Sequence, residues 1–174
     1  MHAVSVLKVW LERNACFMHG ARRAALLKVT RGLLVGGIAA LSQIGRHVLA
    51  GARDKAGIKC VDRLLGNPHL QSERVRVYGE LARWLLSRTP RPWLIIDWSE
   101  VCPGHRFVRL KAAVPLGGRA LTIYEEVHPL KRHNSPRVHQ AFLKRLSRWV
   151  PAGCRPIVIT DAGFRGPWFR QVES

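Results

Sequence analysis

Two aspartates, Asp97 and Asp161, each follow a short run of large apolar residues and are the residues of this sequence best suited to chemistry. The first run reads LIID and the second IVITD. Such a run is typical of a strand buried on both faces, and α/β folds place their functional groups at the carboxyl ends of these strands. We therefore expect each strand to carry one carboxylate at its carboxyl end.

If the two strands are parallel neighbours, their carboxylates lie close together. Close like charges raise one pKa or recruit a cation, and hard carboxylate oxygens suit Mg²⁺ or Mn²⁺. Two such ions about 3.5–4 Å apart can activate a water and stabilise the leaving oxygen of a phosphodiester. The pattern thus predicts Asp97 and Asp161 as catalytic metal ligands. The alternative is that each aspartate forms an ordinary turn or caps a helix.

The elements that must position these aspartates lie in the second half of the chain. Strand patterns cover residues 93–98, 105–114 and 119–127, with PLGG as a hairpin turn between the last two. An amphipathic helix is predicted over 135–150, with Ser135 as its cap, and the run 155–164 follows it. We predict an α/β fold with a mixed sheet, in the order strand, strand, strand, helix, strand.

The first half of the chain has the apolar spacing of several short helices. Pro90 and Pro92 mark a boundary, so we predict a helical region over 1–90 and a sheet domain over 91–174. One buried helical stripe is predicted at four leucines, Leu26, Leu27, Leu33 and Leu34.

The charge of the chain favours a polyanionic partner. It has 29 Lys and Arg against 11 Asp and Glu, a net charge of +18, and both halves are basic. Nucleic acid is the expected partner. The longest apolar run, Gly32–Leu41, has ten residues and is shorter than the roughly 20 that span a bilayer. We expect a soluble cytoplasmic protein with no membrane partner, whose four widely spaced cysteines, Cys16, Cys60, Cys102 and Cys154, are reduced.

Two helical segments in the first half have the character of a helix-turn-helix. They cover residues 41–50 and 58–67, and the second carries Lys59 and Arg63 on its polar face. These two side chains are predicted to contact DNA. The connector of about seven residues is longer than the usual three or four, and two core helices of a bundle remain an equal alternative.

Four stretches resemble the bacterial insertion-sequence transposases of the DDE superfamily, in the family with a Tyr-Arg-Glu-Lys signature. They read IKCVDRLLGN, LIIDWSEV, YEEVHPLKRHNS and PIVITDAGFRGPWF and occur in that order. The resemblance implies an RNase-H-like catalytic domain behind a helical DNA-binding region, Mg²⁺ dependence, and cleavage and rejoining of double-stranded DNA at transposon ends. Asp97 and Asp161 match the first two members of its acidic triad.

The sequence departs from this family at the third carboxylate. The family places it on a later helix, whereas Glu173 is the last acidic residue here and lies in a different context, FRQVES. We therefore expect an amino-terminal part of a transposase that is inactive alone, located in the bacterial cytoplasm at the nucleoid. It would form a homodimer or associate with a full-length transposase. One alternative is a non-catalytic DNA-binding protein that competes with transposition, and another is an RNase-H-fold resolvase.

Other polar residues are assigned simpler roles. Lys131, Arg132 and Arg137 are predicted to contact DNA backbone phosphates, with an exposed charged loop as the alternative. Glu125 and Glu126 are predicted to be solvated. Three histidines, His128, His133 and His139, do not have the spacing of helical metal ligands and are predicted to be solvated or to contact phosphate.

Overall fold

The computed structural model describes residues 2–48, 54–101, 104 and 106–173. The chain divides into two compact units, Met1–Val77 and Tyr78–Ser174. The change from helices to strands falls between residues 86 and 93, close to the predicted boundary at 90. The compact units divide earlier, within a helix, because the carboxyl-terminal end of that helix packs with the sheet. Gly79 is so close to Trp149 that a Cβ there would lie 2.7 Å from Nε1 of the indole.

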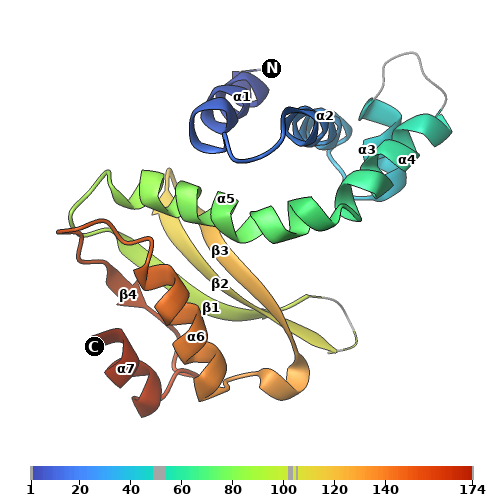
Figure 1. Ribbon diagram of the computed structural model, residues 1–174. Helices are drawn as coiled ribbons and strands as arrows, with labels where there is room; N and C mark the ends of the chain where they lie inside the picture. Colours follow the sequence, from blue (N-terminus) through green and yellow to red (C-terminus); the bar gives the residue numbers. More distant parts are fainter. Residues whose placement is uncertain (1, 49–53, 102–103, 105, 174) are drawn as a thin grey trace. The chain divides into compact units, whose positions relative to one another are not determined.

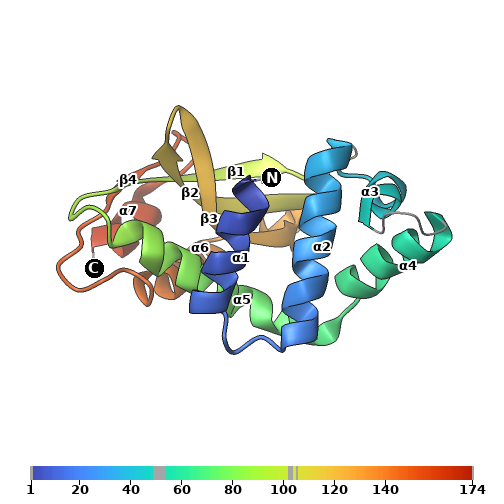
Figure 2. The same cartoon turned by 90° about the horizontal axis from the view of Figure 1, so that it is seen from above.

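The first unit is helical, as predicted, and its helices are coloured blue to green in Figure 1. Figure 2 shows α1 and α2 side by side, with α3 and α4 beyond α2. The helices are α1 His2–Asn14, α2 Gly20–Gly36, α3 Leu41–Val48, α4 Asp54–Leu65 and α5 Pro68–Leu86, of which α5 continues into the second unit. No single described helix is long and apolar enough to cross a membrane; α2 and α3 meet that criterion only as a pair bent by 108°.

Glycines allow three of these helices to approach closely. A Cβ on Gly57 of α4 would lie 2.0 Å from the carbonyl oxygen of Gly45 in α3, and a Cβ on Gly32 of α2 would lie 2.9 Å from the carbonyl oxygen of Ile44. Both distances are shorter than any normal contact. The core between the helices contains Val29, Ile44, Val61 and Leu64.

The position of Gly32 explains one wrong prediction. The predicted stripe included Leu34, which is 56% exposed. The buried side of α2 instead follows Val29 and Gly32, because α3 packs against the side that has no side chain at residue 32. Leu26, Leu27 and Leu33 are half-buried. The helix α4 also begins at Asp54 rather than at the predicted Ile58, and the last two residues of the predicted 41–50 helix lie outside the described residues.

The second unit is a four-stranded mixed sheet with helices on one face. Its strands are β1 Trp93–Glu100, β2 Phe107–Leu116, β3 Arg119–Pro129 and β4 Ile157–Ile159. They lie in the order β3-β2-β1-β4; β1 and β3 are antiparallel to β2, and β4 is parallel to β1. The α/β class and the predicted order of strands and helix are confirmed. The hairpin turn is also confirmed, since Gly117 and Gly118 join β2 to β3 with φ of 56° and 76°, which glycine adopts without strain.

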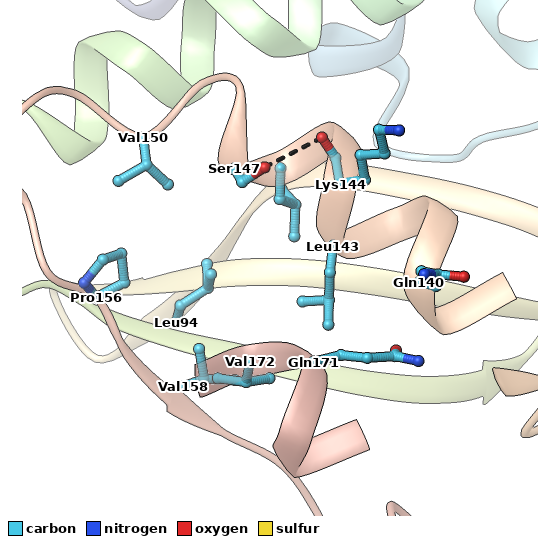
Figure 3. Close-up of a pocket in the computed structure, with 11 residues that line it drawn as sticks. Leu94, Gln140, Leu143, Lys144, Ser147, Val150, Pro156, Val158, Gln171 and Val172 are labelled. Carbon is cyan, nitrogen blue, oxygen red and sulfur yellow. Dashed lines mark hydrogen bonds between the residues drawn. The ribbon is translucent and has the colours of Figure 1, made fainter. Parts of the chain in front are cut away.

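Helices α6 Pro136–Ser147 and α7 Gly166–Glu173 lie side by side against the sheet (Figure 1). The predicted apolar side of α6 is confirmed, since Val138, Phe142 and Leu146 are buried. Ser135 precedes α6, but its side chain forms no capping hydrogen bond. Figure 3 shows Leu143 of α6 and Leu94 of β1 pointing into a pocket that Val158 of β4 also lines.

The close crossing of α3 and α4 leads to a test of the first unit. We expect Gly57→Ala to destabilise it by about 1–3 kcal/mol, because a methyl group at 2.0 Å from a backbone oxygen forces the helices apart. Chemical denaturation followed by circular dichroism measures the effect. Gly20→Ala in α2 is the matched control, since a Cβ there meets nothing within 4 Å. Equal stability of the two variants would contradict the crossing.

Candidate metal and nucleic-acid sites

Asp97 lies on the face of the sheet opposite α6. Successive side chains along β1 point to opposite faces of the sheet. Leu94, Ile96 and Trp98 face α6, and the Trp98 indole donates a hydrogen bond to His139 of that helix. Asp97 therefore lies on the other face. It is half-buried and is paired across the antiparallel ladder with Lys111 of β2. A carboxylate and an ammonium group therefore project from neighbouring strands on one side of the sheet.

Asp161 follows β4, which pairs with β1 as predicted. The parallel ladder ends with Ile95 opposite Ile159, and each aspartate comes two residues after its member of that pair. The prediction that the two strands are parallel neighbours is therefore confirmed. The prediction that Asp97 ends its strand is wrong, because β1 and its ladder with β2 continue to Glu100. A shared ion stays a prediction.

A tight turn fixes the backbone around Asp161. The carboxylate Oδ1 accepts a hydrogen bond of 2.9 Å from the Gly163 amide, and the Asp161 carbonyl accepts one of 3.3 Å from the Phe164 amide. Phe164 is buried and anchors the turn, whereas Asp161 is exposed. This is the turn-forming role that any isolated aspartate can have, and it leaves Asp161 accessible to solvent.

A pocket of about 360 Å³ opens at this end of the sheet. Its walls come from the end of β1, the segment before α6 and the turn after β4, and they include Trp98, Glu100, Val108, His133, Asn134 and Asp161. Asp97 is not among these residues, as expected for a side chain on the other face. Asp161 thus shares this pocket with Trp98 of the α6 face, whereas Asp97 lies on the other face of the sheet.

A buried histidine on α6 links the two strand ends. The Trp98 indole donates a hydrogen bond of 3.0 Å to Nε2 of His139, and the His139 ring stacks on Phe164 with centroids 5.0 Å apart. Because Trp98 follows Asp97 and Phe164 closes the Asp161 turn, His139 contacts both aspartate-bearing segments. His139 is 4% exposed, so the prediction that it is solvated is wrong. The alternative, that it contacts phosphate, stays a prediction. Burial lowers its pKa, and the charge of His133 lowers it further.

Glu126 is also not solvated, contrary to the prediction. It lies on the α6 face and forms an ion pair with Arg145 of α6, while its Oε2 is 2.9 Å from Nε2 of His128. The Tyr124 hydroxyl donates to the same carboxylate, and burial raises the pKa of that phenol. Glu126 is therefore part of a structural network between β3 and α6. Glu125 is half-buried and pairs with Arg109 at 3.6 Å.

Exposed cations lie in the segment that forms one wall of the pocket beside Asp161. Lys131 and Arg132 lie in the short 3-10 helix η1 Leu130–Arg132, and Arg137 lies in the first turn of α6. All three are exposed and are close in sequence to His133 and Asn134 of the pocket wall. The structure thus brings these predicted phosphate contacts to the Asp161 side of the sheet.

Lys59 and Arg63, the other predicted DNA contacts, are one turn apart on the exposed side of α4. The opposite side buries Val61 and Leu64. Lys55 is exposed one turn before Lys59 and was missed, although its spacing of four residues from Lys59 indicates the same side of the helix. This basic surface belongs to the first unit and the aspartate pair to the second.

The candidate metal site has some of the ligand groups that a hard divalent cation requires. Asp97, within β1, and Asp161, two residues after β4, carry the carboxylate oxygens that Mg²⁺ and Mn²⁺ prefer as ligands. Among the described residues, no group of three His, Cys, Asp or Glu side chains has a metal-binding arrangement. Glu173, at the end of α7, is exposed. Cys16, Cys60 and Cys154 are free thiols, and Cys102 lies outside the described residues.

Comparisons with known proteins found no match to a family model, to a curated protein or to a solved structure.

The buried His139 leads to a prediction about pH. Its pKa is lower in the folded protein than its ordinary value of 6.5, so the unfolded chain binds the extra proton as the pH falls. The stability that neutral His139 contributes is present above pH 6.5 and is lost as the pH falls through the folded pKa, by at most about 1.4 kcal/mol per pH unit.

Urea unfolding at pH 7.5 and pH 5.5 measures this effect. We expect the wild type to lose more stability between these values than His139→Gln does. His128 and His133, the other histidines beside Trp98, remain in both proteins, so the difference isolates His139. An identical loss in both proteins would show that the buried ring does not titrate in this range.

Proposed function

We propose that this chain is a DNA-binding protein of the DDE transposase type, with an RNase-H-like sheet in which Asp97 and Asp161 hold a divalent cation. The observation that carries the proposal is the parallel pairing of β1 with β4, which places both aspartates two residues beyond the last ladder pair. Three antiparallel strands, a helical crossover and a fourth strand parallel to the first support the RNase-H-like assignment. The sequence resemblance supplies the reaction class.

The residues have separate tasks in this proposal. Asp97 and Asp161 supply carboxylate oxygens to Mg²⁺ or Mn²⁺, which when bound would stabilise charge on a phosphodiester. Lys131, Arg132 and Arg137 neutralise backbone phosphates next to Asp161, and Lys59 and Arg63 bind the duplex through α4. His139 holds the two aspartate-bearing segments through Trp98 and Phe164.

Cleavage in a DDE enzyme requires a third carboxylate in addition to this pair. We therefore propose binding of double-stranded DNA and of a divalent ion, and not cleavage by these 174 residues alone. The non-catalytic alternative, a competitor that occupies transposon ends, requires the DNA-binding surface without the metal site. Metal binding and DNA binding are for this reason tested separately.

The metal site is tested by titrating the purified chain with Mn²⁺ and following free Mn²⁺ by electron paramagnetic resonance. We expect one site whose affinity falls at least about tenfold in Asp97→Asn and in Asp161→Asn, because each substitution removes a charged ligand from a small donor set. Asp62→Asn, an exposed aspartate on α4, is the matched control. Binding that is equal in the wild type and both site variants would refute the site and favour the competitor.

The DNA surface is tested through the salt dependence of duplex binding. Each phosphate that a cation neutralises contributes about −0.9 to the slope of log K against log salt. Replacing both Lys59 and Arg63 by alanine should make the slope shallower by about 1.8, measured by fluorescence anisotropy. Lys8→Ala in α1, an exposed lysine paired with Glu12, also removes one positive charge. If Lys8→Ala makes the slope shallower by about half as much as the double variant, each lost charge has the same effect in α1 and in α4. In that case α4 is not the specific DNA-binding helix.

A further inference from the structure

A second pocket, of about 360 Å³, lies between the amino-terminal ends of α6 and α7. Its walls are formed by the residues that begin these helices and by the buried histidine, namely Asn134, Pro136, His139, Arg165, Pro167 and Trp168. It shares Asn134 and Gly163 with the pocket that contains Asp161, so the two pockets adjoin. None of its lining residues is acidic.

His139 presents a hydrogen-bond donor to this pocket. An indole N–H can only donate, so Nε2 of His139, which receives the Trp98 bond, carries no proton. A neutral imidazole then carries its proton on Nδ1. Burial favours the neutral ring. No described residue forms a hydrogen bond with Nδ1, although the side chain is buried and lines the pocket. Nδ1 is not among the fully enclosed polar atoms that lack a partner in the described residues, so it is open to the pocket and can donate to a ligand or water there.

The other groups at the pocket also favour an anion. The amino-terminal end of a helix carries partial positive charge and unpaired amides. Two helices begin here, but in α7 Pro167 has no N–H and the Trp168 amide donates to the Arg165 carbonyl at 2.8 Å, so α6 is the source of free amides. The Ser135 side chain does not cap α6, so it leaves the first amides of that helix available. Arg165 is exposed at the rim and Asn134 adds a side-chain amide. The adjoining pocket is lined by two acidic residues, Glu100 and Asp161, and the Asp161 carboxylate accepts a hydrogen bond from the Gly163 amide.

We propose that this pocket binds a phosphate group, which accepts a hydrogen bond from Nδ1–H of His139 and is held by Arg165 and the beginning of α6. The phosphate belongs to a DNA strand that passes the Asp161 turn. This identification of DNA as the source rests on the proposed function. A free phosphate ion would use the same donors. The pocket would then fix the strand beside Asp161, with Arg165 as a phosphate contact that was not predicted from the sequence.

The test uses the full chain with ¹⁵N-labelled histidine and long-range proton–nitrogen NMR. The His139 signals are assigned through contact with the Trp98 indole proton. In phosphate-free buffer, the spectrum should show Nδ1 as the protonated nitrogen. Inorganic phosphate, added at constant ionic strength against chloride, should shift the Nδ1 signal saturably. Protonation on Nε2, or a shift that is absent or does not saturate, would overturn the proposal.

Two variants identify the other donors. Arg165→Gln and Asn134→Gly should each weaken phosphate binding, the former about tenfold because a charge-assisted bond is lost. Glycine suits residue 134, where φ is 55°. Arg148→Gln, an exposed arginine after the other end of α6, is the matched control and should bind as the wild type does. Equal affinity of Arg165→Gln and Arg148→Gln would refute the assigned site.

A duplex oligonucleotide distinguishes the source of the phosphate. It should shift the same Nδ1 signal, and inorganic phosphate should compete with it. If phosphate shifts the signal and DNA does not, although DNA binds through α4, the pocket takes free phosphate and the DNA source is wrong. If DNA does not bind the chain at all, the proposed function fails while the phosphate result still decides the pocket.

Discussion

The candidate metal site depends on one constraint, the parallel pairing of β1 with β4. An antiparallel neighbour would place its carboxyl end at the opposite end of β1, and Asp161 would then lie far from Asp97. Parallel neighbours need a crossover, and η1 and α6 lie in the crossover of this chain. The buried side of α6, with Phe142 and Leu146, holds that crossover against the sheet. The apolar residues of α6 therefore hold the crossover that lets β4 lie parallel to β1.

The same helix also fixes the ends of the strands. β4 has three residues and a short ladder, so the backbone at Asp161 needs support from beyond the sheet. His139 provides it by accepting from Trp98 and stacking on Phe164. A larger apolar residue could fill the space but could not accept the indole proton, and an exposed histidine could not stack on a buried ring. The burial of a titratable group is thus explained by two contacts: the Trp98 bond needs a hydrogen-bond acceptor, and the Phe164 contact needs an aromatic ring.

Periodicity predicted the strands and their order because these follow from local pattern, although it placed Asp97 at the end of a strand that continues to Glu100. The apolar runs before Asp97 and Asp161 and the glycine pair at 117–118 each indicate structure within a few residues. Whether His139, Glu126 and Leu34 are buried or exposed depends instead on partners that are distant in sequence. His139 needs Trp98, Glu126 needs Arg145, and the exposure of Leu34 follows from the packing of α3 on Gly32. No local signal in a single sequence identifies such partners.

The distribution of charge bears on how metal and DNA binding would depend on each other. Asp97 has Lys111 as its neighbour across the ladder, and exposed cations lie in the segment that forms one wall of the pocket beside Asp161. Nearby positive charge weakens the attraction of a carboxylate pair for a divalent cation. A DNA phosphate that neutralises those cations would remove this penalty and add an oxygen ligand of its own. In a chain with a net charge of +18, two carboxylates are therefore better suited to bind a cation together with DNA than alone.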